Sequence, residues 1–463
     1  MSFTAPVFIA FCLCFFPLYL VVARRRRGRN LFILGMSYLF YGWWDWRFLL
    51  LIAGTCLIDY KVAQAIEDSA DPGRRKRFLW LSLASNLGVL GFFKYYNFFV
   101  GSSESVLRWF GLQPDAATLG IILPVGISFY TFQSIAYVVD VYLGKVQAER
   151  DAVLFFAYVS YFPQLAAGPI ERAGHLLTQF REVQLPTRAG IALGAWLVVQ
   201  GYFTKMVVAD TLAPWVNLNF NANQTLGWST VLATLAFGLQ IYGDFKGYSL
   251  IAKGLAAFMG FELMWNFDRP YWATSVQDFW HRWHISLSTW LRDYLFIPLG
   301  GSRASPLRVC LNLMVTMVLG GLWHGPGWNF LIWGAWHGLA LCAHYLWRQR
   351  AGEGRPGLGG WLVTMAVVFV GWFFFRATEV AIWRQMLAAL GNLAWLPAHT
   401  ALLRTVLGVA LPLALLEYLE FARGRDLRGE FKRFWVAGLE ALMLVLIFAA
   451  SQRPSVDFIY FQF

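Results

Sequence analysis

Long runs of apolar residues alternate with short polar or basic tracts along the whole chain. Several runs reach the roughly 20 residues that an α-helix needs to cross a hydrocarbon layer about 30 Å thick. The pattern predicts spanning helices near residues 5–22, 31–44, 48–66, 78–100, 153–168, 191–213, 228–250, 306–323, 328–346, 358–376, 400–421 and 434–450. We therefore expect an all-α polytopic membrane protein of about 11–13 transmembrane helices, with residues 1–463 forming a single membrane-embedded domain.

Two stretches do not fit a simple series of spanning hairpins. Residues 119–144 form an apolar run that is punctuated by Pro124, Gly126 and Gly144, so we expect broken helices there. Irregular backbone at membrane depth survives only where protein or a water-filled cavity satisfies its polar groups. Residues 261–301 are too polar for a span and too rich in Trp, Phe and Leu for a solvated loop. We expect this second stretch to lie in the interface or to re-enter the membrane.

Composition agrees with a membrane protein. Apolar residues make up 58% of the 463 residues, and the mean hydropathy is +0.51. Both values exceed those of an ordinary soluble domain. The net charge of +12 comes from basic residues that gather in short tracts beside apolar runs. Such tracts orient a chain in a bilayer, so we expect membrane lipid as the surroundings and no nucleic-acid partner.

The basic tracts also predict a topology. Cytoplasmic loops carry an excess of Lys and Arg. The tracts that this rule places in the cytoplasm are Arg24, Arg25, Arg26, Arg27 and Arg29; Arg74, Arg75, Lys76 and Arg77; Arg348, Arg350 and Arg355; and Arg423, Arg425, Arg428, Lys432 and Arg433. Both termini are then extracytoplasmic.

Histidine is informative because the chain has only seven, and ionisable groups inside membrane segments are costly unless they face a polar interior. His281 and His284 are three residues apart, so on a helix they would share a face. Two histidines at this spacing can bind a metal ion. No Cys, Asp or Glu completes a ligand set at a suitable spacing, so we expect no metal and keep interfacial histidines as the alternative.

His324 lies in the sequence Leu-Gly-Gly-Leu-Trp-His-Gly-Pro-Gly, where glycines remove side-chain bulk beside one titratable ring. An imidazole that titrates near neutrality suits proton removal from a hydroxyl group that attacks an acyl carbon. A satisfied core histidine is the alternative. His337, in Trp-His-Gly within the next apolar run, either supports His324 or packs, and His344 and His399 have a structural or interfacial role.

Motifs of several other classes are missing. The sequence contains neither a Gly-x-Ser-x-Gly elbow nor a Walker loop, which disfavours a serine hydrolase and an ATP-driven transporter. A secondary transporter stays open as an alternative, because broken helices and buried ionisable groups also build midplane transport sites. No inverted repeat is evident, and this counts against it.

Long motifs identify a family resemblance. Residues 279–301 read FWHRWHISLSTWLRDYLFIPLGG, and the other matching segments are FKYYNF at 93–98, PVGISFYTFQ at 124–133, FPQLAAGPI at 162–170 and FIYFQF at 458–463. Across nearly its whole length the chain resembles the membrane-bound O-acyltransferases, and among them the bacterial alginate O-acetyltransferase type. It differs from that type at Lys246 and Leu250, where relatives commonly carry Ser and Asp.

The resemblance implies a fold of transmembrane helices and re-entrant segments around a catalytic tunnel. The family's catalytic histidine, in its Trp-His-Gly motif, corresponds to His324, and Trp323 belongs to the same motif. A second recurrent histidine, on the cytoplasmic side of the tunnel, corresponds to His284. Arg292 and Asp293 are further candidates on the donor side. His281 stands where relatives often carry Arg or Asn, so it does not inherit a role.

The resemblance also implies a reaction with two sides, in the bacterial inner membrane. A thioester donor, acetyl-CoA, reaches the tunnel from the cytoplasm, and the acetyl group leaves toward an extracytoplasmic SGNH-like acetyltransferase with a serine nucleophile. That partner, with the polysaccharide-export machinery, acetylates an exported glycan such as alginate, cellulose or peptidoglycan. No bound cofactor is implied. The alternatives are acylation of a protein, a lipid or teichoic acid, and a non-catalytic scaffold of the export complex.

Overall fold

The structure, a computed structural model, describes residues 1–112, 118–165, 168–221, 226–352, 357–423, 434–453, 456, 458 and 459. All regular structure in these residues is helical, and they contain no strand, so the predicted all-α fold is confirmed. The chain forms two compact units. Unit 1 consists of Met1–Gly190 with Leu255–Met264, and unit 2 consists of Ile191–Gly254 with Trp265–Phe463.

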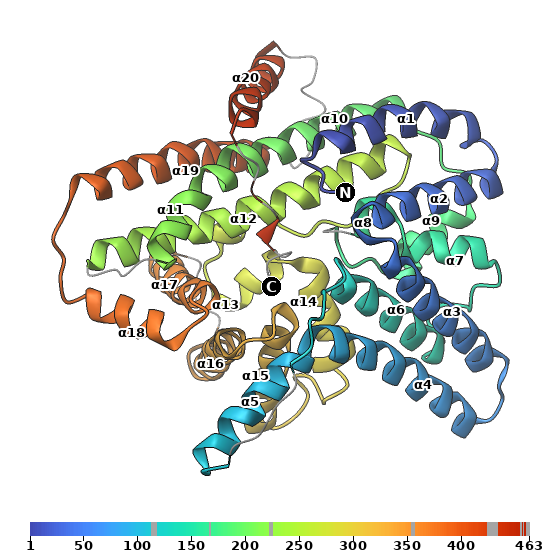
Figure 1. The fold of residues 1–463 in the computed structure, drawn as a ribbon, viewed down its shortest axis with the longest axis horizontal. Helices are drawn as coiled ribbons and strands as arrows, with labels where there is room; N and C mark the ends of the chain where they lie inside the picture. The colour runs from blue at the N-terminus through green and yellow to red at the C-terminus, as the bar shows by residue number, and fades with distance from the viewer. Residues whose placement is uncertain are drawn as a thin grey trace. The chain divides into compact units, whose positions relative to one another are not determined.

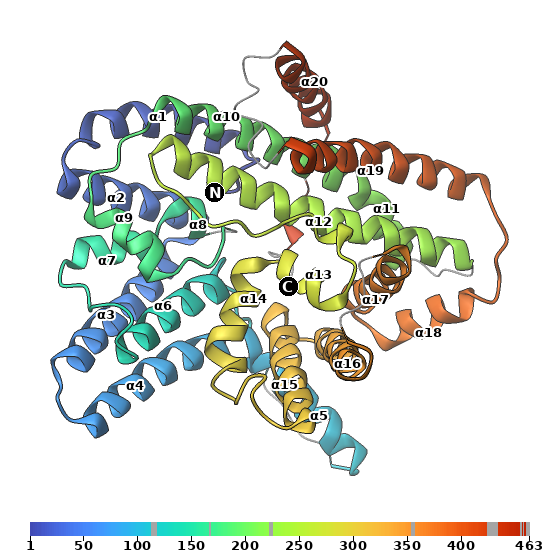
Figure 2. The ribbon, with the colours of Figure 1, turned by 180° about the vertical axis from the view of Figure 1, so that it is seen from behind.

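Unit 1 contains the first part of the chain. Helix α3 packs against α2, α4 and α6, and Figure 1 and Figure 2 show α3, α4 and α6 side by side. The elements are α1 (Pro6–Val22), α2 (Arg26–Asp45), α3 (Arg47–Asp68), α4 (Pro72–Leu90), the π-helix η1 (Gly91–Tyr95), α5 (Tyr96–Trp109), α6 (Ile127–Tyr142), α7 (Ala152–Val159), α8 (Phe162–Leu165), the π-helix η2 (Ala173–Leu177) and α9 (Thr178–Arg181).

A buried carboxylate joins two helices of unit 1. Asp59 of α3 is fully buried and accepts hydrogen bonds from Ser82 at 2.6 Å and from Asn86 at 2.9 Å, both on α4. A charge in a membrane segment is costly unless protein groups replace its water. The two donors from α4 replace that water and so fix the packing of α3 on α4.

Unit 2 contains the predicted site residues. Helix α16 packs against α15 and α17, and the short helix α13 packs against α14, α16 and α17 (Figure 2). The elements are α10 (Arg188–Tyr202), the π-helix η3 (Phe203–Ala209), α11 (Asp210–Asn221), α12 (Gly227–Phe258), the 3-10 helix η4 (Pro270–Trp272), α13 (Val276–Arg282), α14 (Ile285–Leu291), the π-helix η5 (Arg292–Phe296), α15 (Pro306–His324), α16 (Trp328–Ala351), α17 (Leu358–Arg376), α18 (Val380–Ala389), α19 (Pro397–Arg423) and α20 (Phe434–Ser451). Helices α10 and α12 each have one end in unit 1.

Each predicted span overlaps a helix of the structure. Among the described residues, five helical stretches are long and apolar enough to cross a membrane: Arg47–Asp68, Arg188–Phe220, Pro306–His324, Leu358–Arg376 and Pro397–Ala422. Shorter apolar helices occupy Pro6–Val22, Ala152–Leu165 and Val436–Ser451. The chain is thus a helical membrane protein, while the number of spans stays a prediction.

The prediction of broken helices in residues 119–144 is wrong. Helix α6 runs without a break from Ile127 to Tyr142. Pro124 and Gly126 precede it, with Gly126 at a φ of 74° as its N-cap, and Gly144, at a φ of 71°, follows its end. The proline and glycines that suggested a break therefore mark the two ends of one helix.

Residues 261–301 form the short elements η4, α13, α14 and η5, so no single helix crosses this stretch, as the sequence predicts. Some predictions lie outside the described residues. These are the basic residues Arg355, Arg425, Arg428, Lys432 and Arg433, the pair Ala166 and Ala167, and the terminal residues 460–463.

Candidate active site

The hairpin of α15 and α16 holds His324. His324 is the last residue of α15 and is 3% exposed. A side chain at Gly321 would place its Cβ 2.2 Å from the carbonyl oxygen of Phe330, and one at Gly334 would meet the carbonyl oxygen of Met317 at 2.4 Å. Since only glycine allows this approach, the small residues near the Trp-His-Gly sequence bring the two helix backbones together.

His284 lies in a turn between two short helices. Helix α13 ends at Arg282, and His284 has a φ of 42°, in the left-handed region that non-glycine residues rarely adopt. Asn266 fixes this turn, because its carbonyl oxygen accepts the N–H of Ile285 at 2.8 Å and its side chain accepts the Ser286 hydroxyl at 2.6 Å. Backbone strain of this kind clusters at functional sites.

The turn corrects one sequence prediction. His281 and His284 do not share a helix face, because the helix ends between them. His281 is exposed, whereas His284 is fully buried. Burial lowers the pKa of His284 to about 3, so its imidazole is neutral at physiological pH.

Aromatic rings surround the two candidate histidines. The ring of His324 lies 5.0 Å from Trp323, 5.0 Å from Trp333 and 5.3 Å from Phe375, measured between centroids. The ring of His284 is 6.5 Å from that of His324 and 5.8 Å from that of Trp323. Residues 40 positions apart in the chain thus meet in one buried cluster, with Trp323 beside both histidines.

His337 lies one ring further from His284. Its ring is 5.0 Å from Trp333 and 5.2 Å from Trp280, and Gly371 of α17 lies so close that an added Cβ would be 2.5 Å from His337 Nε2. Trp333 therefore contacts both His337 and His324. The structure brings His337 into the cluster through Trp333.

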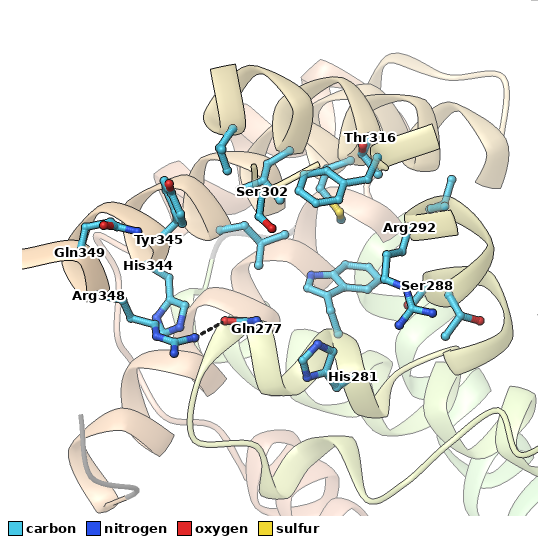
Figure 3. A pocket seen from close by; sticks show the side chains of 18 of the residues that line it. Gln277, His281, Ser288, Arg292, Ser302, Thr316, His344, Tyr345, Arg348 and Gln349 are labelled. Atoms are coloured by element: carbon cyan, nitrogen blue, oxygen red, sulfur yellow. Dashed lines mark hydrogen bonds between the residues drawn. The ribbon is translucent and has the colours of Figure 1, made fainter. Parts of the chain in front are cut away.

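A large pocket adjoins this cluster. Its volume is about 960 Å³, and Trp280 and Met317 form part of its wall. Figure 3 shows polar side chains around it: Gln277 and His281 from α13, Ser288 from α14, Arg292 from η5, Ser302, Thr316 from α15, and His344, Tyr345, Arg348 and Gln349 from α16. Arg348 donates a hydrogen bond to Gln277 at 2.8 Å. The pocket therefore carries the two arginines Arg292 and Arg348, and Trp280 in its wall packs against Trp333 of the histidine cluster.

The predicted donor-side residues lie at this pocket. Arg292 lines it and pairs with Asp293 at 2.8 Å, and the Arg292 side chain is 58% exposed. His344, expected to be structural or interfacial, lines the pocket as well. His399 is instead buried away from it and accepts the backbone N–H of Leu396 at 3.0 Å, which is a structural contact at the start of α19.

Sequence reasoning missed the wall behind His284. The ring of Phe245 lies 4.5 Å from that of His284, and Phe458 lies 6.0 Å from Phe245 and 4.3 Å from Tyr248. Phe245 and Tyr248 lie in the same segment as Lys246 and Leu250, the two positions at which the chain differs from the family pattern. That segment was the available signal, but only the fold brings residues 245 and 458 together.

Buried ion pairs hold the same wall. Lys205 is 1% exposed and pairs with Asp210 and Asp244, each at 2.7 Å. Lys205 also donates to the carbonyl oxygen of Val456 at 2.9 Å, and Asp244 accepts the N–H of Ile459 at 2.6 Å. This cluster therefore anchors the chain on both sides of Phe458.

Lys246, which differs from the family pattern, also has a buried partner. It pairs with Glu417 at 2.9 Å, and Glu417 also accepts hydrogen bonds from Tyr242 and Trp272. Leu250, the other difference, is buried. In the part of the chain that the structure describes, no three His, Cys, Asp or Glu residues gather as a metal site would require.

A buried histidine pair beside a large pocket, in a helical membrane protein, fits the class of membrane-embedded enzymes that use acid–base chemistry. Residues 150–383 match the profile of the MBOAT, membrane-bound O-acyltransferase family. The chain belongs to this family and is an O-acetyltransferase.

Curated relatives agree with the family. The chain is 42% identical over 388 residues to the "Probable alginate O-acetylase" of Pseudomonas aeruginosa, covering 83% of this chain and 74% of that protein. It is 35% identical over 412 residues to the "Peptidoglycan O-acetyltransferase" of Helicobacter pylori, covering 82% and 77%. It is 26% identical over 253 residues to the "Teichoic acid D-alanyltransferase" of Streptococcus thermophilus, covering 49% and 58%.

Proposed function

We propose that this O-acetyltransferase takes its acetyl group from acetyl-CoA in the cytoplasm and passes it across the membrane for O-acetylation of an exported polysaccharide, such as alginate or cellulose. The observation that carries the proposal is the buried pair of His284 and His324, with ring centroids 6.5 Å apart, beside a pocket of about 960 Å³. The names of the alginate- and peptidoglycan-acetylating relatives support the choice of acceptor.

In the proposed mechanism His324 is the general base that removes the proton from the attacking hydroxyl group and then gives it to the leaving thiolate. His284, held neutral by its burial, orients the reacting groups from the other side of Trp323. The rings of Trp323, Trp333 and Phe375 exclude water, which protects the thioester from hydrolysis. His337 supports this cluster through Trp333.

The pocket suits the donor. CoA carries phosphates, and Arg292 and Arg348 provide positive charge at the pocket wall. Arg348 lies in the last turn of α16, in a basic tract that the positive-inside rule places in the cytoplasm. Asp293 positions Arg292 through their ion pair.

We also propose where the enzyme is located and which proteins it works with. The chain acts as one acyltransferase domain in the bacterial inner membrane, surrounded by lipid, with both termini outside and no bound cofactor. An SGNH-like acetyltransferase outside the membrane receives the acetyl group and works with the polysaccharide-export machinery. Labelling of single cysteines placed in the basic tract near Arg75 and near the N-terminus tests the topology, since only the second is expected to react from outside.

The acetyl content of the exported polysaccharide tests the function. Cells producing His324→Ala or His284→Ala at normal membrane abundance are expected to lose acetylation. His175→Gln is the matched control, because His175 is half-exposed and pairs with Glu171 in unit 1. Unchanged acetylation in His324→Ala would remove His324 from the mechanism and favour a scaffold or transport role.

A second candidate is transfer of D-alanine to teichoic acid, or of an acyl group to a protein or lipid. The similarity to a teichoic acid D-alanyltransferase over half of this chain favours the first of these. Radiolabelled acetate and D-alanine separate the candidates, because only the true acyl group enters a product in a His324-dependent way.

A further inference from the structure

Three buried side chains between the pocket and His324 carry polar nitrogens that have no hydrogen-bond partner among the described residues. These atoms are Nε1 of Trp280, Nε1 of Trp333 and both ring nitrogens of His337. Buried polar atoms in folded proteins nearly always have a partner, because an unpaired one loses its water without compensation. The exceptions therefore need an explanation.

Two other tryptophans of unit 2 have the usual hydrogen-bond partner for their indole N–H. Trp336, three residues after Trp333 on the same helix, donates its N–H to the carbonyl oxygen of Val367 at 2.8 Å. Trp361 donates to the carbonyl oxygen of Tyr271 at 2.8 Å. The indole N–H groups of Trp336 and Trp361, outside the cluster, are thus satisfied by backbone carbonyl oxygens.

The unpaired donors form a series between the pocket and the catalytic histidine. Trp280 lines the pocket, and its ring is 5.6 Å from that of Trp333. Trp333 is 1% exposed, and its ring is 5.0 Å from that of His324 at an interplanar angle of 87°. On a path from the pocket to His324, a thioester passes Trp280 first and then reaches Trp333 and His324 together.

The reaction needs a hydrogen-bond donor at this place. As the acceptor hydroxyl passes its proton to His324, its oxygen bonds to the carbonyl carbon, and the electron pair of the C=O bond moves to the carbonyl oxygen. When that pair returns, the C–S bond breaks and the thiolate takes the proton from His324. An oxyanion of this kind is stabilised by preorganised donors, and an indole nitrogen can only donate.

We propose that the indole N–H of Trp333 donates a hydrogen bond to this oxyanion, and that Trp280 guides the thioester to it. The inference rests on the proposed function, because it names a further catalytic residue of the same site. The Trp333 N–H has no hydrogen-bond partner among the described residues because its partner, the oxyanion, exists only during the reaction.

The test replaces only the N–H group. β-(3-Benzothienyl)alanine at position 333 keeps the size and shape of the indole but carries sulfur in place of nitrogen, and Trp333→Phe is the simpler variant. The same two replacements at Trp336 are the matched controls. Each protein, in lipid vesicles, is assayed for thiol release and acetyl transfer from acetyl-CoA, and its thermal unfolding is measured.

Loss of one oxyanion donor lowers kcat about 100-fold or more. We therefore expect the benzothienyl variant at 333 to lose about 100-fold in kcat, with the KM for acetyl-CoA and the unfolding temperature close to wild type. The Trp336 variants should keep kcat within about threefold. If Trp333→Phe does not accumulate in the membrane, the benzothienyl variant decides.

The experiment distinguishes failure of the role of Trp333 from failure of the proposed function. If the wild type uses acetyl-CoA through His324 but the benzothienyl variant at 333 keeps kcat within threefold, the role of Trp333 is wrong and the proposed function stands. A fall in kcat that is matched at 336 also overturns the inference. If the wild type releases no thiol from acetyl-CoA, the proposed donor is wrong and the inference falls with it.

Discussion

Unit 2 contains two kinds of buried polar groups: some have hydrogen-bond or ion-pair partners, and others have none among the described residues. Around Lys205, each charge has an opposite charge or a backbone group within 3 Å. Around His324, the neighbours are aromatic rings, and the nitrogens of Trp333 and His337 have no partner among the described residues. Groups that the fold satisfies stabilise it, whereas groups that the fold leaves open are available to a substrate.

The largest effect on activity is expected in the aromatic cluster around His324. His324→Gln removes the proposed general base but keeps a polar side chain of similar length, so acetyl transfer should fall about 1,000-fold. The unfolding temperature should change little. Acetyl transfer from acetyl-CoA and thermal unfolding measure both, and a variant that unfolds early without losing activity per folded molecule contradicts this division of roles.

The ion-pair cluster around Lys205 should respond in the opposite way, with a loss of stability. Lys205→Met leaves Asp210 and Asp244 buried without their cation, which is expected to cost about 3–5 kcal/mol of unfolding free energy. The double variant Lys205→Met/Asp244→Asn should recover part of this loss, because one buried charge disappears. Thermal unfolding in detergent measures it.

An exposed ion pair provides the control. Arg74 lies 3.8 Å from Asp71, and the two side chains are 70% and 53% exposed, so Arg74→Met should cost less than about 1 kcal/mol. Equal losses for Arg74→Met and Lys205→Met would mean that burial does not set the strength of these pairs.

The pocket should show a binding effect. Arg348→Ala removes a charged hydrogen-bond donor from the pocket wall, so the KM for acetyl-CoA is expected to rise about tenfold with kcat unchanged. Arg350→Ala changes an exposed arginine of the same turn that does not line the pocket, and should leave both constants unchanged. An equal rise for both variants would indicate a general effect of positive charge at the end of α16.

The smallest effect is expected at a histidine with ordinary partners. His399 accepts the N–H of Leu396 and lies 3.0 Å from the Ser229 hydroxyl, so it acts as a cap at the start of α19. His399→Ala should cost about 1 kcal/mol of unfolding free energy. Activity per folded molecule should not change, and a loss of activity would place His399 in the reaction.

The sequence predicted much of the fold because hydrophobic runs of spanning length directly reflect the solvent around them. Each of these runs became a helix. The error at residues 119–144 arose because a proline or glycine can either end a helix or break one, and the local sequence does not distinguish the two. The tertiary structure placed these residues at the ends of α6.

The candidate active site was likewise predicted in part from the sequence and decided in part by the tertiary structure. The sequence singled out His324 through the glycines beside it in an apolar run, and it singled out His284 through the family resemblance of residues 279–301. The sequence could not reveal that α13 ends before His284, that Trp333 lies between His324 and His337, or that Lys205 anchors the chain around Phe458. The Lys205 contact joins residues far apart in the chain, and the other two features depend on where helices end and how they pack. Only packing therefore determines which polar groups have partners.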